Sequence, residues 1–286
     1  MKEVNSRTSA FLERKESSSL PINISIITIT YNRLDGLVET FESVVNQTHK
    51  EYEYIIVDGG SDDGTVDFLE ENSCSISKWV SEPDEGIYDA MNKGISLASG
   101  EWLIFMNAGD FFFCDRTLQE LELYLDSSYD VLFGGVESIY DDQYGYRTST
   151  SLPHDISLLW QQIPTCHQSI VVRRDIQTKY LFNTSFNWCA DHDFLAKLYS
   201  DSCKMKSVSL IISRFEASGD RQRDLLTYTK ERWTIYRRYF EHMLSRDLFF
   251  INEYRSFWLQ KNVNQKIREW LPANWIVLSR KLRGIG

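Results

Sequence analysis

Apolar runs alternate with stretches of helical periodicity over the first part of the chain. Four β-branched or aromatic runs predict strands, at 22–30, 54–57, 76–80 and 102–106. Apolar residues spaced three and four positions apart predict the helices that join them, at 34–45, 65–71 and 87–98. Because helices of this length connect successive strands, we expect right-handed crossovers and a mostly parallel sheet.

The regular alternation of predicted strands and helices ends after residue 113. A helix is predicted at 117–125, and strands at 130–133 and 168–173 with a polar, tyrosine-rich loop between them. A further helix is predicted at 193–199 and a further strand at 207–213. From residue 225 the pattern predicts helices to the C-terminus.

This order of elements suggests three parts. Residues 1–20 lack apolar periodicity and are expected to be a mobile leader. Residues 21–220 are predicted to form one α/β domain, with a first half ending at 113 and a second half from 114. Residues 221–286 are predicted to be a helical extension.

Polar turns follow all four of the first predicted strands. They are Tyr31-Asn32-Arg33, Asp58-Gly59-Gly60-Ser61-Asp62-Asp63-Gly64, Ser81-Glu82-Pro83-Asp84-Glu85-Gly86 and Asn107-Ala108-Gly109-Asp110. In open α/β sheets, ligands bind beyond the carboxyl ends of the strands. We therefore expect the four turns to converge on one pocket, and their acidic and glycine residues to form a nucleotide and metal site.

The charge is distributed unevenly along the chain. The net charge of the 286 residues is −10, but residues 221–286 carry 14 Lys and Arg against 6 Asp and Glu, or +8. The remainder carries 17 against 35, or −18. The acidic body disfavours a nucleic-acid partner, whereas a basic tail containing tryptophan suits an anionic membrane surface.

Other features bear on location and cofactors. The sequence lacks an apolar run of the roughly 20 residues that a membrane-spanning helix needs. Its polar first residues are unlike a signal peptide, so a cytoplasmic protein is expected. The five cysteines form no C-x-x-C pair, which favours reduced structural thiols over disulfides or a zinc site. The first strands also lack a following G-x-G-x-x-G, which disfavours a nicotinamide or flavin site.

Three carboxylates are candidates for chemistry. Asp58 is placed to accept hydrogen bonds from a base imide or a ribose, or else makes only a turn. Asp110 is placed to bind Mg²⁺ or Mn²⁺ together with a substrate diphosphate, or else caps a helix or lies in the turn. Asp191 and Asp193 lie just before a predicted helix, where Asp191 could serve as a general base. The local pattern alone favours the simpler interpretation, in which Asp193 caps the helix and Asp191 is solvated.

Four segments together resemble glycosyltransferase family 2. They are T-Y-N-R at 30–33, V-D-G-G-S-D-D-G-T at 57–65, E-P-D-E-G-I-Y-D-A-M-N-K-G at 82–94 and N-A-G-D at 107–110. Their order and spacing also match. The resemblance implies an α/β GT-A fold, in which a Rossmann-like nucleotide half and an acceptor half share one mostly parallel central sheet flanked by helices.

The resemblance also implies roles for residues of the first half. Thr30, Tyr31 and Arg33 would line the base pocket, and Asp58 would meet the base or ribose. Asp84 would contact the nucleoside or the donor sugar, with Asn92 and Lys93 on the helix behind it. Asp110 matches the last acid of a D-x-D-like metal motif, whose first acid is replaced by Asn107, which can still offer a carbonyl oxygen.

Roles in the second half follow in the same way. The segment A-D-H-D-F at 190–194 resembles the motif whose acid deprotonates the acceptor, which matches Asp191. His167 and Gln168 resemble a pair near the acceptor; His167, like His192, could also titrate, bind metal or be structural. Arg221 and Arg223 would steady the departing diphosphate, or else form a solvated basic loop.

The expected reaction is therefore transfer of a sugar from a nucleoside-diphosphate sugar to a hydroxyl of a glycan or lipid-linked precursor. Configuration would invert, with Mn²⁺ or Mg²⁺ as cofactor. Thr229 replaces the glutamine of the Gln-x-x-Arg-Trp motif of processive synthases, so one sugar per encounter is expected. The basic, aromatic segment 266–282 would rest on the cytoplasmic face of a membrane, or else pack on the domain or a second subunit. A sugar-nucleotide pyrophosphorylase and an inactive glycan- or nucleotide-sugar-binding module are the alternatives.

Overall fold

The computed structural model describes residues 24–142, 145–217 and 224–270 of the chain. Its first half is a parallel sheet in the order β3-β2-β1-β4, with a helix after each of the first three strands. The strands are β1 (Ile24–Thr30), β2 (Tyr52–Asp58), β3 (Lys78–Ser81) and β4 (Trp102–Phe105). The helices are α1 (Leu34–Val45), α2 (Thr65–Glu71) and α3 (Ile87–Leu97). The predicted strand and helix alternation is confirmed.

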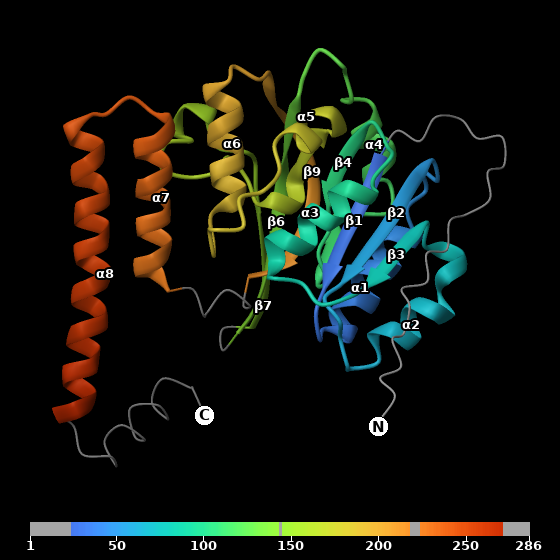
Figure 1. The fold of residues 1–286 in the computed structure, drawn as a ribbon, viewed down its shortest axis with the longest axis horizontal. Helices are drawn as coiled ribbons and strands as arrows, with labels where there is room; N and C mark the ends of the chain where they lie inside the picture. The colour runs from blue at the N-terminus through green and yellow to red at the C-terminus, as the bar shows by residue number, and fades with distance from the viewer. Residues whose placement is uncertain (1–23, 143–144, 218–223, 271–286) are drawn as a thin grey trace, which may run out of the picture.

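The sheet is apolar on both faces because helices cover both (Figure 1). All seven residues of β1 are buried. Ile26 contributes to the core under α1, and Ile27 to the core under α3. Helix α3 packs very close to the sheet at Gly94, where a Cβ atom would lie 2.5 Å from Cγ2 of Ile27. A glycine at this position therefore sets the distance between α3 and the strands.

The second half extends the same sheet in the order β4-β8-β6-β9-β5, and its pairing is mixed. β8 is antiparallel to β4 and β6, while β6 and β9 are parallel. The strands are β5 (Asp110–Phe112), β6 (Val131–Asp142), β7 (Gly145–Ser151), β8 (Ile170–Arg173) and β9 (Met205–Glu216). Of the eight strand pairings, four are parallel: the first half, expected to be mostly parallel, is parallel throughout, and the antiparallel pairings all involve strands of the second half.

One expectation about this half is wrong. The polar, tyrosine-rich stretch after residue 133 is not simply a loop, because β6 continues to Asp142 and pairs with β7 as an antiparallel hairpin. Residues 147–151 of β7 are exposed, so the strand lacks the apolar alternation that identifies a half-buried strand. β7 is a strand because its backbone pairs with β6, and its side-chain pattern alone does not predict it.

Helices complete the second half. They are α4 (Thr117–Glu122), α5 (Arg174–Lys179), α6 (Ala190–Ser200), α7 (Leu225–Tyr239) and α8 (Leu244–Trp270). α6 lies against the sheet, and α7 and α8 stand beside it at the end far from β2 and β3 (Figure 1). The predicted helix at 193–199 begins three residues earlier, which places Asp191 and Asp193 inside its first turn rather than before it.

The α7–α8 pair has its own aromatic core. The Trp160 ring makes edge contacts with Tyr236 of α7 and with Phe249 and Phe250 of α8. None of the helices in the described part of the chain has the length and apolar character needed to cross a bilayer. The leader 1–20, and the segment 266–282 except for the backbone of its first residues, lie outside the description.

Candidate active site

The carboxyl ends of the central strands lie at one level. In the strand register, Thr30 pairs with Asp58, and Asp58 pairs with Ser81. The turn after β4 joins the same edge, because the Ala108 N–H donates to the Ile29 carbonyl at 3.1 Å. The turns that follow the strands therefore gather at one edge, as the sequence predicts.

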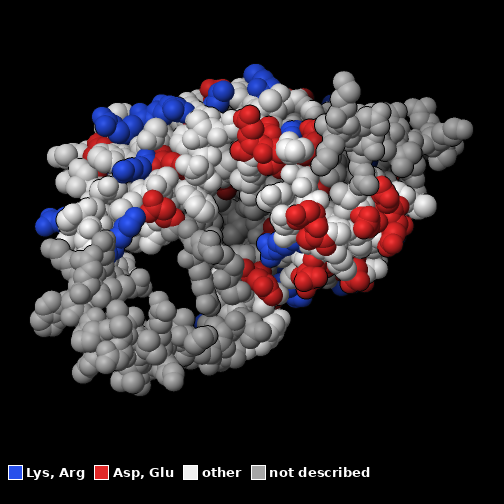
Figure 2. Space-filling model, turned by 60° about the horizontal axis from the view of Figure 1, so that its bottom comes forward, with Lys and Arg blue, Asp and Glu red and all other residues white. Residues whose placement is uncertain are grey.

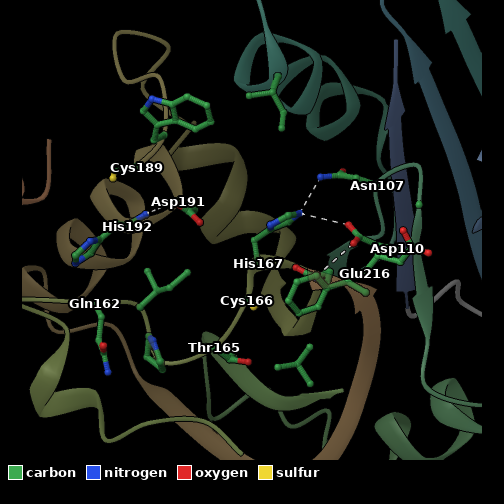
Figure 3. Close-up of a pocket in the computed structure, with 18 of the residues that line it drawn as sticks. Asn107, Asp110, Gln162, Thr165, Cys166, His167, Cys189, Asp191, His192 and Glu216 are labelled. Carbon is green, nitrogen blue, oxygen red and sulfur yellow. Dashed lines mark hydrogen bonds and ion pairs between the residues drawn. The ribbon is translucent and has the colours of Figure 1, made fainter. Parts of the chain in front are cut away.

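A cavity of about 590 Å³ opens beside this edge, between the sheet and α6 (Figure 3). Figure 2 shows a hollow on this side of the molecule, with acidic side chains gathered mostly over the first half of the sheet and basic ones over the helical part. Residues from both halves and from α7 line it. They include Arg33, Asn107, Asp110, Gln162, Thr165, His167, Gln168, Trp188, Asp191, Glu216 and Tyr228.

Asp110 stands at the end of a tight turn that several contacts fix. Its N–H donates to the Asn107 carbonyl at 2.8 Å, and its own carbonyl accepts from the Thr40 hydroxyl at 2.7 Å. Gly109 has φ +92°, and a Cβ there would lie 2.3 Å from the Arg33 guanidinium. Burial raises the pKa of Asp110 to about 7, while the positive charge of Arg33 and the backbone hydrogen bond act to lower it.

Asn107, His167 and Gln168 surround Asp110. Nδ2 of Asn107 lies 2.8 Å from Nε2 of His167, and the same His167 nitrogen lies 4.0 Å from a carboxylate oxygen of Asp110. Nε2 of Gln168 lies 3.4 Å from the other oxygen. The short 3-10 turn at His167–Ser169, just before β8, delivers both side chains. The structure therefore brings Asn107 and Asp110 together with His167 (Figure 3), a grouping that the sequence analysis did not predict.

The donor set fits a hard divalent cation. Among the described residues, the buried side-chain oxygens of Asn107, Thr165 and Gln168 have no hydrogen-bond partner. Oxygen ligands of this kind, with one carboxylate, suit Mg²⁺ or Mn²⁺. In the described part of the chain, no group of three or more His, Cys, Asp or Glu side chains is arranged so that it could hold a metal ion by itself. A cation here would therefore depend on substrate phosphate oxygens to complete its coordination.

Asp191 lies on the opposite wall, in the first turn of α6 (Figure 3). One of its carboxylate oxygens accepts from the His192 N–H at 2.8 Å. The side chain is half-buried and lines the same cavity as Asp110. A carboxylate held at the start of a helix beside a cavity has the rigidity that a general base requires.

The neighbours of Asp191 are structural. Nε2 of His192 bonds to the Leu159 carbonyl, and burial lowers the pKa of His192 to about 4. Asp193 forms an ion pair with Arg238 of α7 at 3.1 Å, so it links two helices rather than capping one. His192 is therefore a neutral core histidine, which is the structural role considered from the sequence.

Asp58 is placed differently from the other two carboxylates. It is fully buried at the end of β2. Its oxygens accept hydrogen bonds from the Ser61 N–H at 3.0 Å, from the Ser61 hydroxyl and from the Ser81 hydroxyl at 2.6 Å. In this conformation Asp58 holds the turn after β2 against β3. Of the three candidate carboxylates, only Asp110 and Asp191 line the cavity.

The remaining predicted donor residues surround that turn. The Thr30 hydroxyl is buried and lacks a described partner, whereas Tyr31 is 65% exposed. A Cβ at Gly59 would lie 2.6 Å from the Asp84 carboxylate and 3.1 Å from the Tyr31 ring. Tyr31 and Asp84 therefore lie close over the Gly59 backbone and leave no room for a side chain at position 59.

Asn92 and Lys93 of α3 have other contacts. Asn92 exchanges two hydrogen bonds with the Phe182 backbone, both at 2.9 Å. Lys93 bonds to the Pro83 carbonyl and pairs with Glu82 and Asp89. These contacts fix α3 and the turn before it, and the two side chains are absent from the described cavity wall. Arg221 and Arg223 lie outside the described residues.

Several cavity residues escaped the sequence reasoning. Thr165 lies two positions before His167, and Trp188 lies three positions before Asp191. Glu216 ends β9, which pairs with β5 and so runs beside Asp110. Tyr228 comes from α7. Proximity to a motif could have identified the first two, but Glu216 and Tyr228 reach the cavity only through strand pairing and helix packing.

Comparison with known proteins defines the class to which this site belongs. The profile of glycosyl transferase family 2 matches residues 25–198, which is more than half of the chain. The chain therefore belongs to glycosyl transferase family 2. Its sheet and flanking helices form the GT-A fold expected from the sequence, with a helical C-terminal part.

Two mycobacterial relatives are similar in sequence. A PGL/p-HBAD biosynthesis glycosyltransferase of Mycobacterium bovis is 31% identical over 183 residues, which cover 62% of this chain and 70% of the relative. An uncharacterized glycosyltransferase of Mycobacterium tuberculosis is 47% identical over 90 residues. That match covers 31% of this chain and only 34% of the relative's own length.

Two solved structures share the fold. S. aureus TarS in complex with UDP-GlcNAc has a TM-score of 0.60 at 16% identity, over 83% of this chain and 73% of that one. The mannosyltransferase PcManGT from Pyrobaculum calidifontis, in complex with GDP-Man and Mn²⁺, has a TM-score of 0.54 at 17% identity. That likeness covers 75% of this chain and 61% of the other. At such identities the likeness concerns the fold alone.

Proposed function

We propose that this chain transfers a sugar from a nucleoside-diphosphate sugar to an acceptor hydroxyl, with inversion of configuration. The observation that carries the proposal is that Asp110 and Asp191 line one cavity at the carboxyl edge of the sheet. Family membership supports the reaction class. The fold relatives bound to UDP-GlcNAc and GDP-Man support a nucleotide-sugar donor, with uridine and guanosine as the bases to test first.

Asp191 is the proposed base. Its carboxylate takes the proton of the acceptor hydroxyl, whose oxygen attacks the anomeric carbon as the bond to the nucleoside diphosphate breaks. A single displacement of this kind inverts the configuration. Base catalysis by a positioned carboxylate contributes about 10²- to 10⁴-fold to such reactions.

The donor lies on the sheet side in this proposal. The Tyr31, Gly59 and Asp84 surface takes the base and ribose, Thr30 and Asp58 support the strand ends beneath, and Arg33 faces the diphosphate. Asn92 and Lys93 hold α3 behind this surface.

His167 and Gln168 lie between donor and acceptor, where the Gln168 amide can contact a sugar hydroxyl. Arg221 and Arg223 remain proposed contacts of the leaving diphosphate.

We further propose that Mn²⁺ or Mg²⁺ is required. Asp110 and the unpartnered Asn107 oxygen would hold it together with the donor phosphates. A bound divalent cation would neutralise the charge that develops on the leaving diphosphate. The Mn²⁺ in the complex of PcManGT supports this requirement.

Transfer of one sugar per encounter is proposed from α7. Thr229 stands where the motif of processive synthases has glutamine. The Arg-Trp pair of that motif is present, but Arg232 pairs with Glu253 and the Trp233 N–H donates to Asp247 at 2.8 Å. Both side chains therefore bind α8. The proposed acceptor is a glycan or lipid-linked precursor of a cell-surface polysaccharide, with residues 266–286 contacting the anionic membrane face.

One assay tests the function. The chain is incubated with UDP- and GDP-sugars, with and without Mn²⁺, and the released products are separated. Cation-stimulated release of nucleoside diphosphate, even at the slow rate of hydrolysis by water, is expected. Release of pyrophosphate instead would indicate a pyrophosphorylase. Tight donor binding without any product would indicate an inactive binding module.

A further inference from the structure

We propose that Glu231, on α7, is a positioning residue for Asp191, acting through its own carboxylate. The inference rests on the proposed role of Asp191. The two residues are 40 positions apart in the chain, and α7 and α6 lie side by side (Figure 1). Their coupling runs through the segment that leads into α6.

The Glu231 carboxylate holds that segment through its backbone. One oxygen accepts from the Asn187 N–H at 2.8 Å. The other accepts from the N–H groups of Trp188 and Cys189, at 3.0 and 3.1 Å. Cys189 immediately precedes Ala190, the first residue of α6, and Asp191 is the second.

A helix start needs such a partner. N–H groups at and before the first turn of a helix have no carbonyl within the helix to bond to, and they carry its positive end. The residue before α6 is a cysteine that makes no capping hydrogen bond through its side chain. Glu231 accepts instead from the three N–H groups that lead into the helix, and it brings a negative charge from another helix close to the positive end of α6. It is 9% exposed, so water competes weakly for these bonds.

The rest of α7 makes the support rigid. Arg232 forms two hydrogen bonds of 3.0 Å with the Glu253 carboxylate of α8 and bonds to the Gln161 carbonyl at 2.7 Å. Arg238 pairs with Asp193; it lies about two turns after Glu231 on α7, and Asp193 is in the same first turn of α6 as Asp191. Glu231 is therefore held on a helix that is fixed on both sides of it.

The cavity itself depends on the same contacts. Trp188, whose N–H bonds to Glu231, lines the cavity, and so does Tyr228, which lies one turn before Glu231 on α7. A small movement of α7 would shift the wall and the base together. Since a displacement of about 1 Å can cost on the order of 100-fold in rate, this support matters for turnover more than for donor binding.

The test compares Glu231→Gln with Glu253→Gln in the full chain. Glutamine retains one acceptor oxygen but turns an NH₂ group toward backbone N–H donors. Glu253→Gln weakens the link between α7 and α8 without touching the start of α6. We expect Glu231→Gln to lower kcat about 10- to 100-fold while the dissociation constant for UDP or GDP stays within about twofold. Glu231→Asp, which keeps the charge, should recover part of the lost kcat.

Hydrogen exchange provides a readout that needs no activity. The amides of residues 187–193 should exchange about tenfold faster or more in Glu231→Gln, because bonds to a charged acceptor are lost. Exchange in β1 and β2 should not change, and Glu253→Gln should leave 187–193 protected. Unchanged protection of 187–193 in Glu231→Gln overturns the inference. A different result would be that the wild type shows no transferase activity while Glu231→Gln still loses protection at 187–193. That result would overturn the proposed function but keep Glu231 as the support of α6.

If protection is lost but kcat is unchanged in an active enzyme, Glu231 supports the helix without positioning the base. That outcome also overturns the inference. A loss of kcat of the same size in Glu253→Gln would do so too, because the effect would then come from the helical pair as a whole.

Discussion

Asn107 donates its side-chain amide to Nε2 of His167, 2.8 Å away, and this bond connects the turn after β4 to the turn before β8. Because an amide nitrogen only donates, Nε2 of His167 acts as an acceptor, and the buried Asn107 oxygen is left without a hydrogen-bond partner among the described residues. The residue that departs from the acidic metal motif thus supplies an oxygen and also orients a histidine.

Asn107→Asp tests this double role. A second carboxylate beside Asp110 should strengthen Mn²⁺ binding about tenfold, since charge adds to the attraction that a neutral oxygen provides. Calorimetric titration with Mn²⁺ in the presence of UDP or GDP measures the change. Asn107→Ala serves as the control and should weaken binding. Equal Mn²⁺ affinity in all three proteins would mean that residue 107 is not a ligand.

Asp110→Asn should stabilise the protein while removing its cation response. Burial raises the folded-state pKa of Asp110 from 3.8 to about 7, so the wild type loses stability as the pH rises between these values. An asparagine does not titrate, and at pH 8 without cations the variant should be more stable by about 2–4 kcal/mol.

Thermal unfolding at pH 5 and pH 8 measures this difference, which should be larger at pH 8. Adding Mn²⁺ with UDP or GDP should raise the Tm of the wild type but not that of the variant. A variant that is less stable than the wild type at pH 8 would contradict the prediction.

His192 should make the fold sensitive to acid. Its pKa is lowered from 6.5 to about 4 because burial disfavours the charged form. Its contribution to stability is therefore complete above pH 6.5 and is lost as the pH falls toward 4, by up to about 3 kcal/mol. His192→Gln lacks this titration. Urea unfolding between pH 4 and 7 should show a shallower pH dependence for the variant, and parallel curves for the two proteins would refute the assignment.

Asp191→Asn should separate turnover from donor binding. Removing the base should lower kcat about 10²- to 10⁴-fold, whereas binding of UDP or GDP should stay within about twofold because Asp191 lies on the opposite wall. Asp201→Asn, at the other end of α6, is the matched control and should retain turnover. Full transferase activity in Asp191→Asn would place the base elsewhere.

Local pattern was sufficient for much of the first half. The predicted helices 34–45 and 65–71 match α1 and α2 to the residue, and the strands differ only at their ends. Apolar periodicity and the polar turn at the end of each element are sufficient to predict it. The register of parallel strands then brings the turns together, so the placement of Asn107 and Asp110 at the sheet edge followed from the sequence.

Other features depended on contacts between distant segments. The sequence marked both Asp58 and Asp191 as candidate acids, but only packing showed that the Ser81 hydroxyl bonds to the first while the second lines the cavity. The β6–β7 hairpin and the bonds from Glu231 to the start of α6 likewise have no local signature. Sequence by itself determined the elements and the kind of chemistry, because periodicity and turn residues act over a few positions. Which carboxylate meets a substrate was decided by tertiary structure, because hydrogen bonding and burial depend on residues far away in the chain.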